Sequence, residues 1–314
     1  MLLTVFLLML AFLVGYAIRR GSICAVVATR ALIVDRRTAR FRAFGVAAAG
    51  AGGVIIPLHW LFPDSATLSA GYPVTLQVLL AGAVFGIGAR INDACALGTL
   101  AHLTGGNLVY GATIIGMVMG ATAVGLFGSA SDVTTLFASP LEIPSAGAMT
   151  FVAALVITLT ITLYCRGLRS LRNPSSLRMG PYQAMLIVGI CGGLLYTLAG
   201  NWTYMSVLSH RAARLVDPNL DTENWSVLLC AATVVFGGLT AAWRYRDFDL
   251  RHPHFKGALR CFSGGTMMGA SAAIIPGGNG MLLIHGLPSL APHAIAAYFA
   301  MTAVLCLSFV IRRL

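Results

Sequence analysis

The chain has 314 residues, of which 58% are hydrophobic and only 10% are charged, and its mean hydropathy is +0.83. So little charge cannot cover a water-soluble globule of this length, which excludes an ordinary soluble protein and indicates that lipid is the main solvent. The formal net charge of +11 would suit nucleic acid, but the basic residues gather at the ends of apolar runs, as they do in membrane proteins. No nucleic-acid partner is therefore expected.

Nine apolar runs are long enough to cross a hydrocarbon core about 30 Å thick, which takes about 20 helical residues. In chain order they lie near residues 1 to 18, 41 to 62, 73 to 91, 108 to 128, 146 to 166, 182 to 199, 225 to 243, 257 to 275 and 290 to 311. The sequence therefore predicts an all-α membrane protein with about nine transmembrane helices, surrounded by membrane lipid.

The distribution of basic residues predicts the orientation. If the nine runs alternate across the membrane, one side receives 19 of the 21 lysines and arginines, and the other keeps Arg211 and Arg214. Basic residues are retained on the cytoplasmic side, so we expect a bacterial inner-membrane protein with a periplasmic amino terminus and a cytoplasmic carboxy terminus. The alternative for residues 1 to 18, a cleaved signal peptide, has the wrong polarity, because Arg19 and Arg20 follow the apolar run and no basic residue precedes it.

Four semi-polar segments between the runs are too short to cross the membrane and too apolar for simple loops. They are GSICAVVATRALIV, NDACALGTLAHL, NWTYMSVLSHRAARLV and NGMLLIHGLP. Each begins near Gly, Asn, Ser or Asp, residues that suit tight turns and helix starts. We interpret them as four short re-entrant helices; amphipathic helices on the membrane surface are the alternative.

The two halves of the chain resemble each other. A shift of 183 positions places Gly82 on Gly265, Gly86 on Gly269 and His102 on His285. Four spans in each half and one extra span between them turn the second half upside down, which gives two inverted repeats. We expect a first repeat at 1–130, a connecting helix and cytoplasmic loop at 131–180, and a second repeat at 181–314. Transporters built in this way bind substrate between short or broken helices of both halves.

Cys24 and Cys95 are the candidate substrate-path residues of the first half, because each lies in one of the short segments. A neutral thiol is a weak donor on a polarisable group, so it suits a sulfur-bearing anion that must be bound loosely. The other five cysteines lie in or at the ends of spans and fit buried hydrophobic positions. The spacing of all seven is not that of a disulfide framework.

The ionisable residues near these segments allow two interpretations each. Arg90 and Asp93 either form a local ion pair that shapes the Cys95 loop or mark the cytoplasmic boundary. His102 and His285 are either structural, which is the commoner role of a helical histidine, or part of a site or gate, a role to which their matched repeat positions add weight.

The second half offers different chemistry at the matching places. Gly278 falls opposite Cys95 under the shift of 183, and Met205 falls opposite Cys24 under a shift of 181. The PGGNG turn that contains Gly278 and Asn279 precedes a short apolar helix, whose exposed amides suit an anion. There is no Walker loop and no dinucleotide fingerprint after a strand, so we predict no enzyme, no cofactor and no metal.

Four motifs together resemble the YeeE/YedE family of sulfur-transport proteins: GSICAVVATR, GIGARINDACALGTLAHLTGGN, GGTMMGASAAIIPGGNG and HGLP. The resemblance covers nearly the whole chain. It implies an hourglass of nine spans with short re-entrant helices, thiosulfate uptake, and three cysteines that pass the anion along by hydrogen bonds. Cys24 and Cys95 match two of these; the third is replaced here by the turn around Gly278 and Asn279. The resemblance also implies a small TusA-type sulfur-carrier protein on the cytoplasmic side.

The predicted function is a transporter or channel for a small sulfur-containing anion, thiosulfate first, relayed through Cys24 and Cys95. One alternative is a transporter of another inorganic anion or sulfur species. Others are a membrane thiol or sulfur-transfer enzyme, which needs a reactive thiolate, and a structural subunit, which moves no solute.

Overall fold

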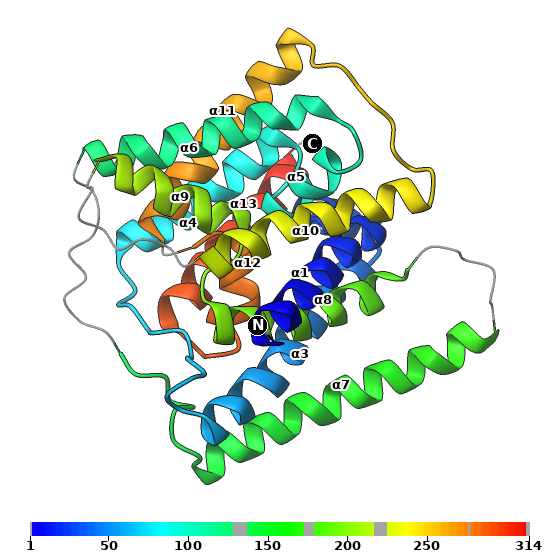
Figure 1. Ribbon diagram of the computed structural model, residues 1–314, viewed down its shortest axis with the longest axis vertical. Coiled ribbons are helices and arrows are strands. Elements are labelled where there is room, and N and C mark those ends of the chain that lie inside the picture. Colours follow the sequence, from blue (N-terminus) through cyan, green and yellow to red (C-terminus); the bar gives the residue numbers. More distant parts are fainter. Residues whose placement is uncertain (1, 128–136, 173–178, 217–224, 276, 312–314) are drawn as a thin grey trace.

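A computed structural model describes residues 2–127, 137–172, 179–216, 225–275 and 277–311. These residues fold almost entirely into helices and contain no β-strand (Figure 1). The nine long helices are α1 (Leu2–Gly21), α3 (Ala39–Leu61), α4 (Leu76–Asn92), α6 (Gly111–Leu126), α7 (Ala146–Arg172), α8 (Pro181–Ala199), α10 (Trp225–Arg244), α11 (Phe255–Ile274) and α13 (Pro292–Ile311). Eight described stretches are long and apolar enough to span a membrane, and the bent pair of α11 with the helix after it makes a ninth. The prediction of an all-α membrane protein is confirmed.

The four short segments are helices in the structure. They form α2 (Ala25–Ile33), α5 (Ala96–Leu103), α9 (Tyr204–Val216) and α12 (Asn279–Met281), which continues into the π-helix η2 (Leu282–Gly286); the short helix η1 (Leu108–Tyr110) precedes α6. Their geometry differs from simple re-entrant loops, because α2, α5 and α9 extend α1, α4 and α8 as single candidate spans. The pair of α11 with α12 and η2 is bent by 55°. Three of the short helices are thus the second parts of interrupted helices, and the fourth follows a bend after α11 that fits a broken span or a re-entrant segment.

Repeat-matched glycines make equivalent helix contacts. Gly82 of α4 lies against the backbone of Ala297 in α13, and Gly265 of α11 lies against the backbone of Thr113 in α6. Small residues let membrane helices approach this closely. In the first contact a glycine of the first half meets a helix of the second half, and in the second contact the halves are reversed. A two-fold relation between inverted repeats requires such a pair of contacts. The repeat boundaries remain a prediction, but the contacts show that helices of each half pack against helices of the other half.

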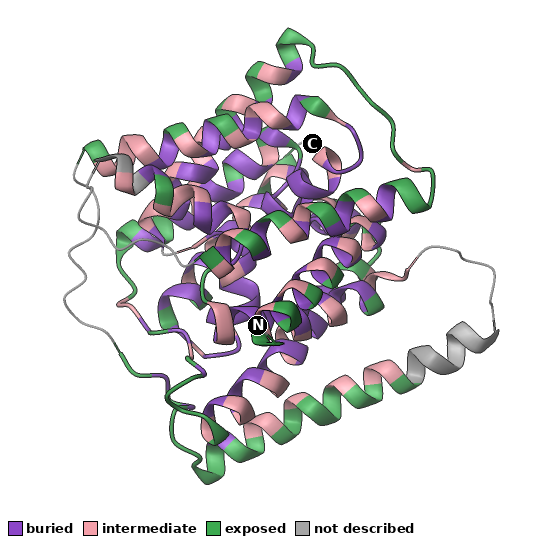
Figure 2. Cartoon of the chain, viewed as in Figure 1, coloured by how far each residue is buried: buried purple, intermediate pink, exposed green. Residues whose placement is uncertain are grey.

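The surface of the bundle is apolar, and α7 lies at its edge with most of its length exposed (Figure 2). Helix α10 begins at Trp225, which is 78% exposed, and ends beside Trp243, which is 82% exposed. At 1.5 Å per residue they lie about 27 Å apart along the axis, close to the thickness of a hydrocarbon core. Tryptophan is enriched at both membrane interfaces, so α10 has the pattern of a complete span.

The connection at 167–181, on which the predicted orientation depends, lies partly outside the described residues.

Candidate functional site

Cys24 and Cys95 each occupy the position before a short helix. Cys24 precedes α2 and Cys95 precedes α5, and both side chains are buried. The breaks that place them there turn through left-handed residues, Ser22 with φ 48° and Asp93 with φ 62°. Asp tolerates this conformation better than most residues, because its short polar side chain bonds locally. Each helix therefore begins with its amide groups directed toward a cysteine.

Each cysteine sulfur accepts a backbone hydrogen bond from the segment that carries the other cysteine. The Ala25 N–H donates to Cys95 Sγ at 3.2 Å, and the Cys95 N–H donates to Cys24 Sγ at 3.5 Å. The two side chains also contact each other, so one S–H group can donate within the pair. The other S–H remains available to a ligand. We refer to Cys24 and Cys95 as the thiol pair.

Asn92 fixes the turn that carries Cys95. Its buried amide donates to Ala94 O at 2.8 Å and Thr99 Oγ1 at 2.9 Å, and it accepts from Thr113 Oγ1 at 2.7 Å. These bonds join the end of α4, the short helix α5 and the start of α6. The sequence analysis did not identify Asn92 or Thr113, although an Asn at the end of an apolar run was a signal.

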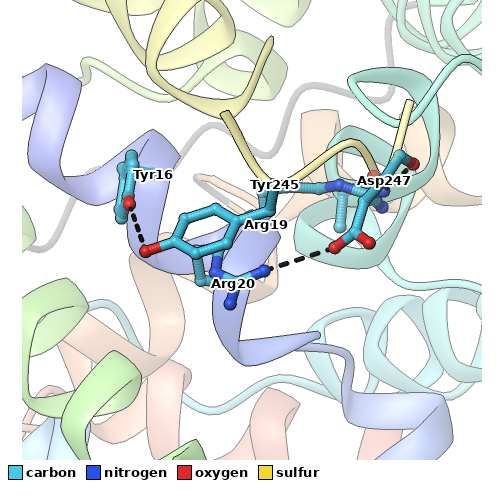
Figure 3. Close-up of polar contacts among 6 residues, drawn as sticks. Tyr16, Arg19, Arg20, Tyr245 and Asp247 are labelled. Atoms are coloured by element: carbon cyan, nitrogen blue, oxygen red, sulfur yellow. Dashed lines mark hydrogen bonds and ion pairs between the residues drawn. The ribbon is translucent and has the colours of Figure 1, made fainter. Parts of the chain in front are cut away.

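A second clamp holds α5 at its other end. Arg19 donates to Ala101 O at 3.1 Å and to Asp247 O at 2.8 Å, so it joins the last turn of α5 to the segment after α10. Arg20 pairs with the Asp247 carboxylate at 3.2 Å and lies over the ring of Tyr245 (Figure 3). A cation near the carboxyl end of a helix interacts favourably with the partial negative charge of the helix dipole at that end. The position of Cys95 is therefore set from both ends of α5.

The second half approaches the thiol pair through Asn279, the first residue of α12. Asn279 is fully buried and its side chain approaches the Cys95 thiol. Neither its Oδ1 nor its Nδ2 has a hydrogen-bond partner among the described residues. Gly278 packs directly against the sulfur of Met205, which is also buried. The structure thus brings together Cys24, Cys95, Asn279, Gly278 and Met205 from both halves.

A small cavity of about 20 Å³ lies between these elements, lined by residues of α1, α5, α9, α10 and the Gly278 turn. Beside it, the Tyr204 hydroxyl donates to Ala96 O at 2.7 Å and so ties α9 to the start of α5. A space of this size holds about one water molecule. The sequence analysis missed Tyr204, because its partner lies more than one hundred residues earlier.

Arg90 and Asp93 form an ion pair at 3.7 Å, so they are near enough to shape the turn before Cys95. They also line a much larger cavity, of about 920 Å³, together with Arg30 of α2 and Arg260 of α11. Both interpretations of this pair therefore have a structural counterpart: it flanks the Cys95 turn, and it lies on an arginine-rich face.

Each of the two matched histidines stacks on a tyrosine ring. The His102 ring stacks on Tyr110 with centroids 4.5 Å apart, and the His285 ring stacks on Tyr196 at 5.3 Å. His285 Nε2 also bonds Thr67 O at 3.1 Å, which anchors the loop after α3. These contacts account for the positions of both imidazole rings. A role for either histidine in the substrate path stays a prediction.

Chemically, the site offers weak donors, helix amides and, within the described residues, the Asn279 amide without a hydrogen bond of good geometry, all in the buried interior. Within the described residues no group of three His, Cys, Asp or Glu side chains is close enough to hold a metal ion. The arrangement suits an anion that is bound by hydrogen bonds and released.

Comparison with known families gives a match to the family model described as "Sulphur transport", over residues 20–307. The matched region contains both cysteines, all four short helices and the Asn279 turn. A comparison with curated proteins gives no match.

Proposed function

The chain belongs to the sulphur-transport family, YeeE/YedE, and from this premise we propose that it takes up a small sulfur-containing anion, with thiosulfate as the first candidate. The thiol pair and Asn279 form the path. The observation that carries the proposal is the buried Asn279 amide, which approaches the Cys95 thiol and makes no hydrogen bond of good geometry within the described residues. An unpaired buried amide costs free energy, and a passing anion or its water can supply the missing partners.

The electrostatics of the broken helices support an anion. The amino ends of α2 and α5 both begin at a cysteine, and the Ala25 and Cys95 amides point at sulfur. A helix amino terminus carries a partial positive charge, which favours an anion without a fixed cation. Thiols bind weakly, so the anion is transferred from donor to donor instead of being trapped.

The path is closed in this conformation. A cavity of about 20 Å³ beside Asn279 accepts about one water molecule and no larger anion. Transport therefore requires a movement at the contact between Met205 and Gly278. The thioether of Met205 is flexible, and a rotamer change there opens space without moving a helix.

The orientation and partners follow from the sequence prediction. We propose that the amino terminus is periplasmic and the protein lies in the bacterial inner membrane, because 19 of the 21 lysines and arginines fall on one predicted side. A TusA-type carrier on that cytoplasmic side would accept the sulfur. The contact between the two thiols also suits a sulfur-transfer enzyme, which forms a persulfide or disulfide during turnover.

Uptake into proteoliposomes tests the proposal. Vesicles with purified protein are given labelled thiosulfate, with sulfate as a competitor and with or without a proton gradient. We expect saturable accumulation of intact thiosulfate, with no persulfide on the protein by mass spectrometry. Uptake equal to that of empty vesicles rules out transport of thiosulfate, and a persulfide formed in every turnover assigns the enzyme instead.

A further inference from the structure

The large cavity beside the thiol pair has a lining that the proposed path does not use. It measures about 920 Å³ and lies between the last turns of α2, α4 and α13 and the first turns of α11. Its arginines are Arg30, Arg90 and Arg260, and we call it the arginine cavity. Asp93 belongs to its wall and lies two residues before Cys95, so the cavity adjoins the thiol pair along the same chain segments.

Among the described residues that line this cavity, the charge is unbalanced. Three guanidinium groups from three helices face one carboxylate, that of Asp93. The Arg90–Asp93 pair is 3.7 Å long and the Asp93 side chain is 52% exposed, so this contact is weak. Neither Arg30 nor Arg260 has a side-chain ion pair or hydrogen bond within the described part of the chain. Like charges held together in this way repel unless an anion joins them.

The geometry of Arg90 leaves donors for a ligand. Its guanidinium lies over the Phe309 ring, 4.6 Å from the centroid, which occupies one face of the planar group. The N–H groups lie in the plane of the guanidinium, so stacking does not use them. Arginine matches the oxygens of a tetrahedral oxyanion with two parallel hydrogen bonds. Ile91 and Phe309 add an apolar wall, which suits a weakly hydrated anion or the glycerol and acyl part of a lipid.

We propose that the arginine cavity is a second anion-binding site, which takes a tetrahedral oxyanion of sulfur or phosphorus between Arg30, Arg90 and Arg260. The oxyanion comes either from solution, as the transported anion beyond the thiol pair, or from the phosphate headgroup of an anionic lipid. Only the first source rests on the proposed function. Binding in the cavity does not require the thiols.

The test measures binding and transport separately. Titration calorimetry on the purified full chain in phosphatidylcholine nanodiscs uses thiosulfate, sulfate and inorganic phosphate as probes. Native mass spectrometry on protein from nanodiscs containing phosphatidylglycerol measures retained lipid. The variants are Arg30→Gln with Arg260→Gln, and the control is Arg244→Gln, an exposed arginine at the end of α10 outside the cavity. Thermal unfolding of each variant checks that it is folded.

For a free anion we expect the double variant to lose at least about tenfold in affinity, which corresponds to about one charge-assisted hydrogen bond. The control Arg244→Gln should bind as the wild type does. For a headgroup we expect the double variant to lose retained phosphatidylglycerol instead. The proposal is overturned if the wild type binds none of the three anions and retains no phosphatidylglycerol, or if the double variant loses no more binding than Arg244→Gln does. Binding without any uptake would reject the transport function and keep this site.

Discussion

The buried amide of Asn279 approaches the thiol of Cys95, and neither its Oδ1 nor its Nδ2 makes a hydrogen bond of good geometry among the described residues. The two residues come from opposite halves of the chain, one at the start of α12 and one at the start of α5. A buried amide without partners is rare in folded proteins and calls for a functional explanation. Under the proposed function a transient anion would supply the missing partner, because the amide would be fully paired only while the anion passes.

Replacing Asn279 tests this explanation. We expect Asn279→Ala to lower uptake about tenfold, the equivalent of one hydrogen bond to an anion, and to leave thermal stability unchanged or slightly higher, because no pair is broken. Asn279→Leu should abolish uptake, since it also fills the space. Labelled uptake and thermal unfolding are measured on the same preparations. A variant that loses stability but keeps uptake contradicts the proposed role.

Cys95 distinguishes a conduit from an enzyme. Cys95→Ala should lower uptake at least about tenfold by removing a donor, with normal expression because little volume changes. Cys95→Ser keeps a donor, so a hydrogen-bonding path should retain part of the uptake, whereas thiol chemistry should be lost in both variants. Cys306→Ala is the matched control, because Cys306 lies in α13 and is half-buried. Uptake of Cys95→Ala at the wild-type rate would falsify the relay.

Asn92 should act by positioning Cys95. Asn92→Leu removes two donated bonds and one accepted bond and leaves Thr99 and Thr113 without their partner. We expect lower uptake together with faster labelling of Cys95 by a small thiol reagent, because the turn loosens. Thr122→Val is the control, since Thr122 bonds only within α6. Unchanged labelling in Asn92→Leu, with reduced uptake, would assign the loss to general destabilisation.

The sequence predicted the elements better than their contacts. Apolar runs of about 20 residues predict spans with no knowledge of packing, and Gly, Asn and Asp mark the four breaks. The contact between Tyr204 and Ala96, or the convergence of Arg30, Arg90 and Arg260 on one cavity, depends on how distant helices pack and leaves no local pattern. The sequence also could not show that α2, α5 and α9 continue the helices before them, because a polar interruption has the same sequence whether the chain turns back or continues.

The orientation has its own test. We introduce single cysteines at exposed positions of two loops, Asp64→Cys after α3 and His252→Cys before α11. An impermeant maleimide should label Asp64→Cys in intact spheroplasts and His252→Cys only after permeabilisation, because the second loop carries the basic residues. A reporter fused in the 167–181 connection should be cytoplasmic. A periplasmic reporter there reverses the assigned orientation and removes the argument for inverted repeats.

The last prediction concerns the turn around Gly278, where the family resemblance leads us to expect a third cysteine. Gly278 has no room for a side chain, because a Cβ there would meet the sulfur of Met205, and Gly277 before it has a φ of 97° that favours glycine. We expect Gly278→Val to lower uptake far more than Cys261→Ala, although Cys261 is chemically closer to the absent residue, because Cys261 is buried within α11. Gly45→Val in α3 is the control for adding volume, since no atom lies within 4 Å of its Cβ position.

A second variant separates the path from simple crowding at this turn. In Gly278→Val with Met205→Ala the added volume is accommodated, so a merely steric defect should recover much of its uptake. The weak acceptor at Met205 is then lost, and a path that uses the thioether should stay impaired. If Cys261→Ala alone reduces uptake while Gly278→Val transports normally, a rearranged cysteine relay is correct and the turn around Asn279 is only structural.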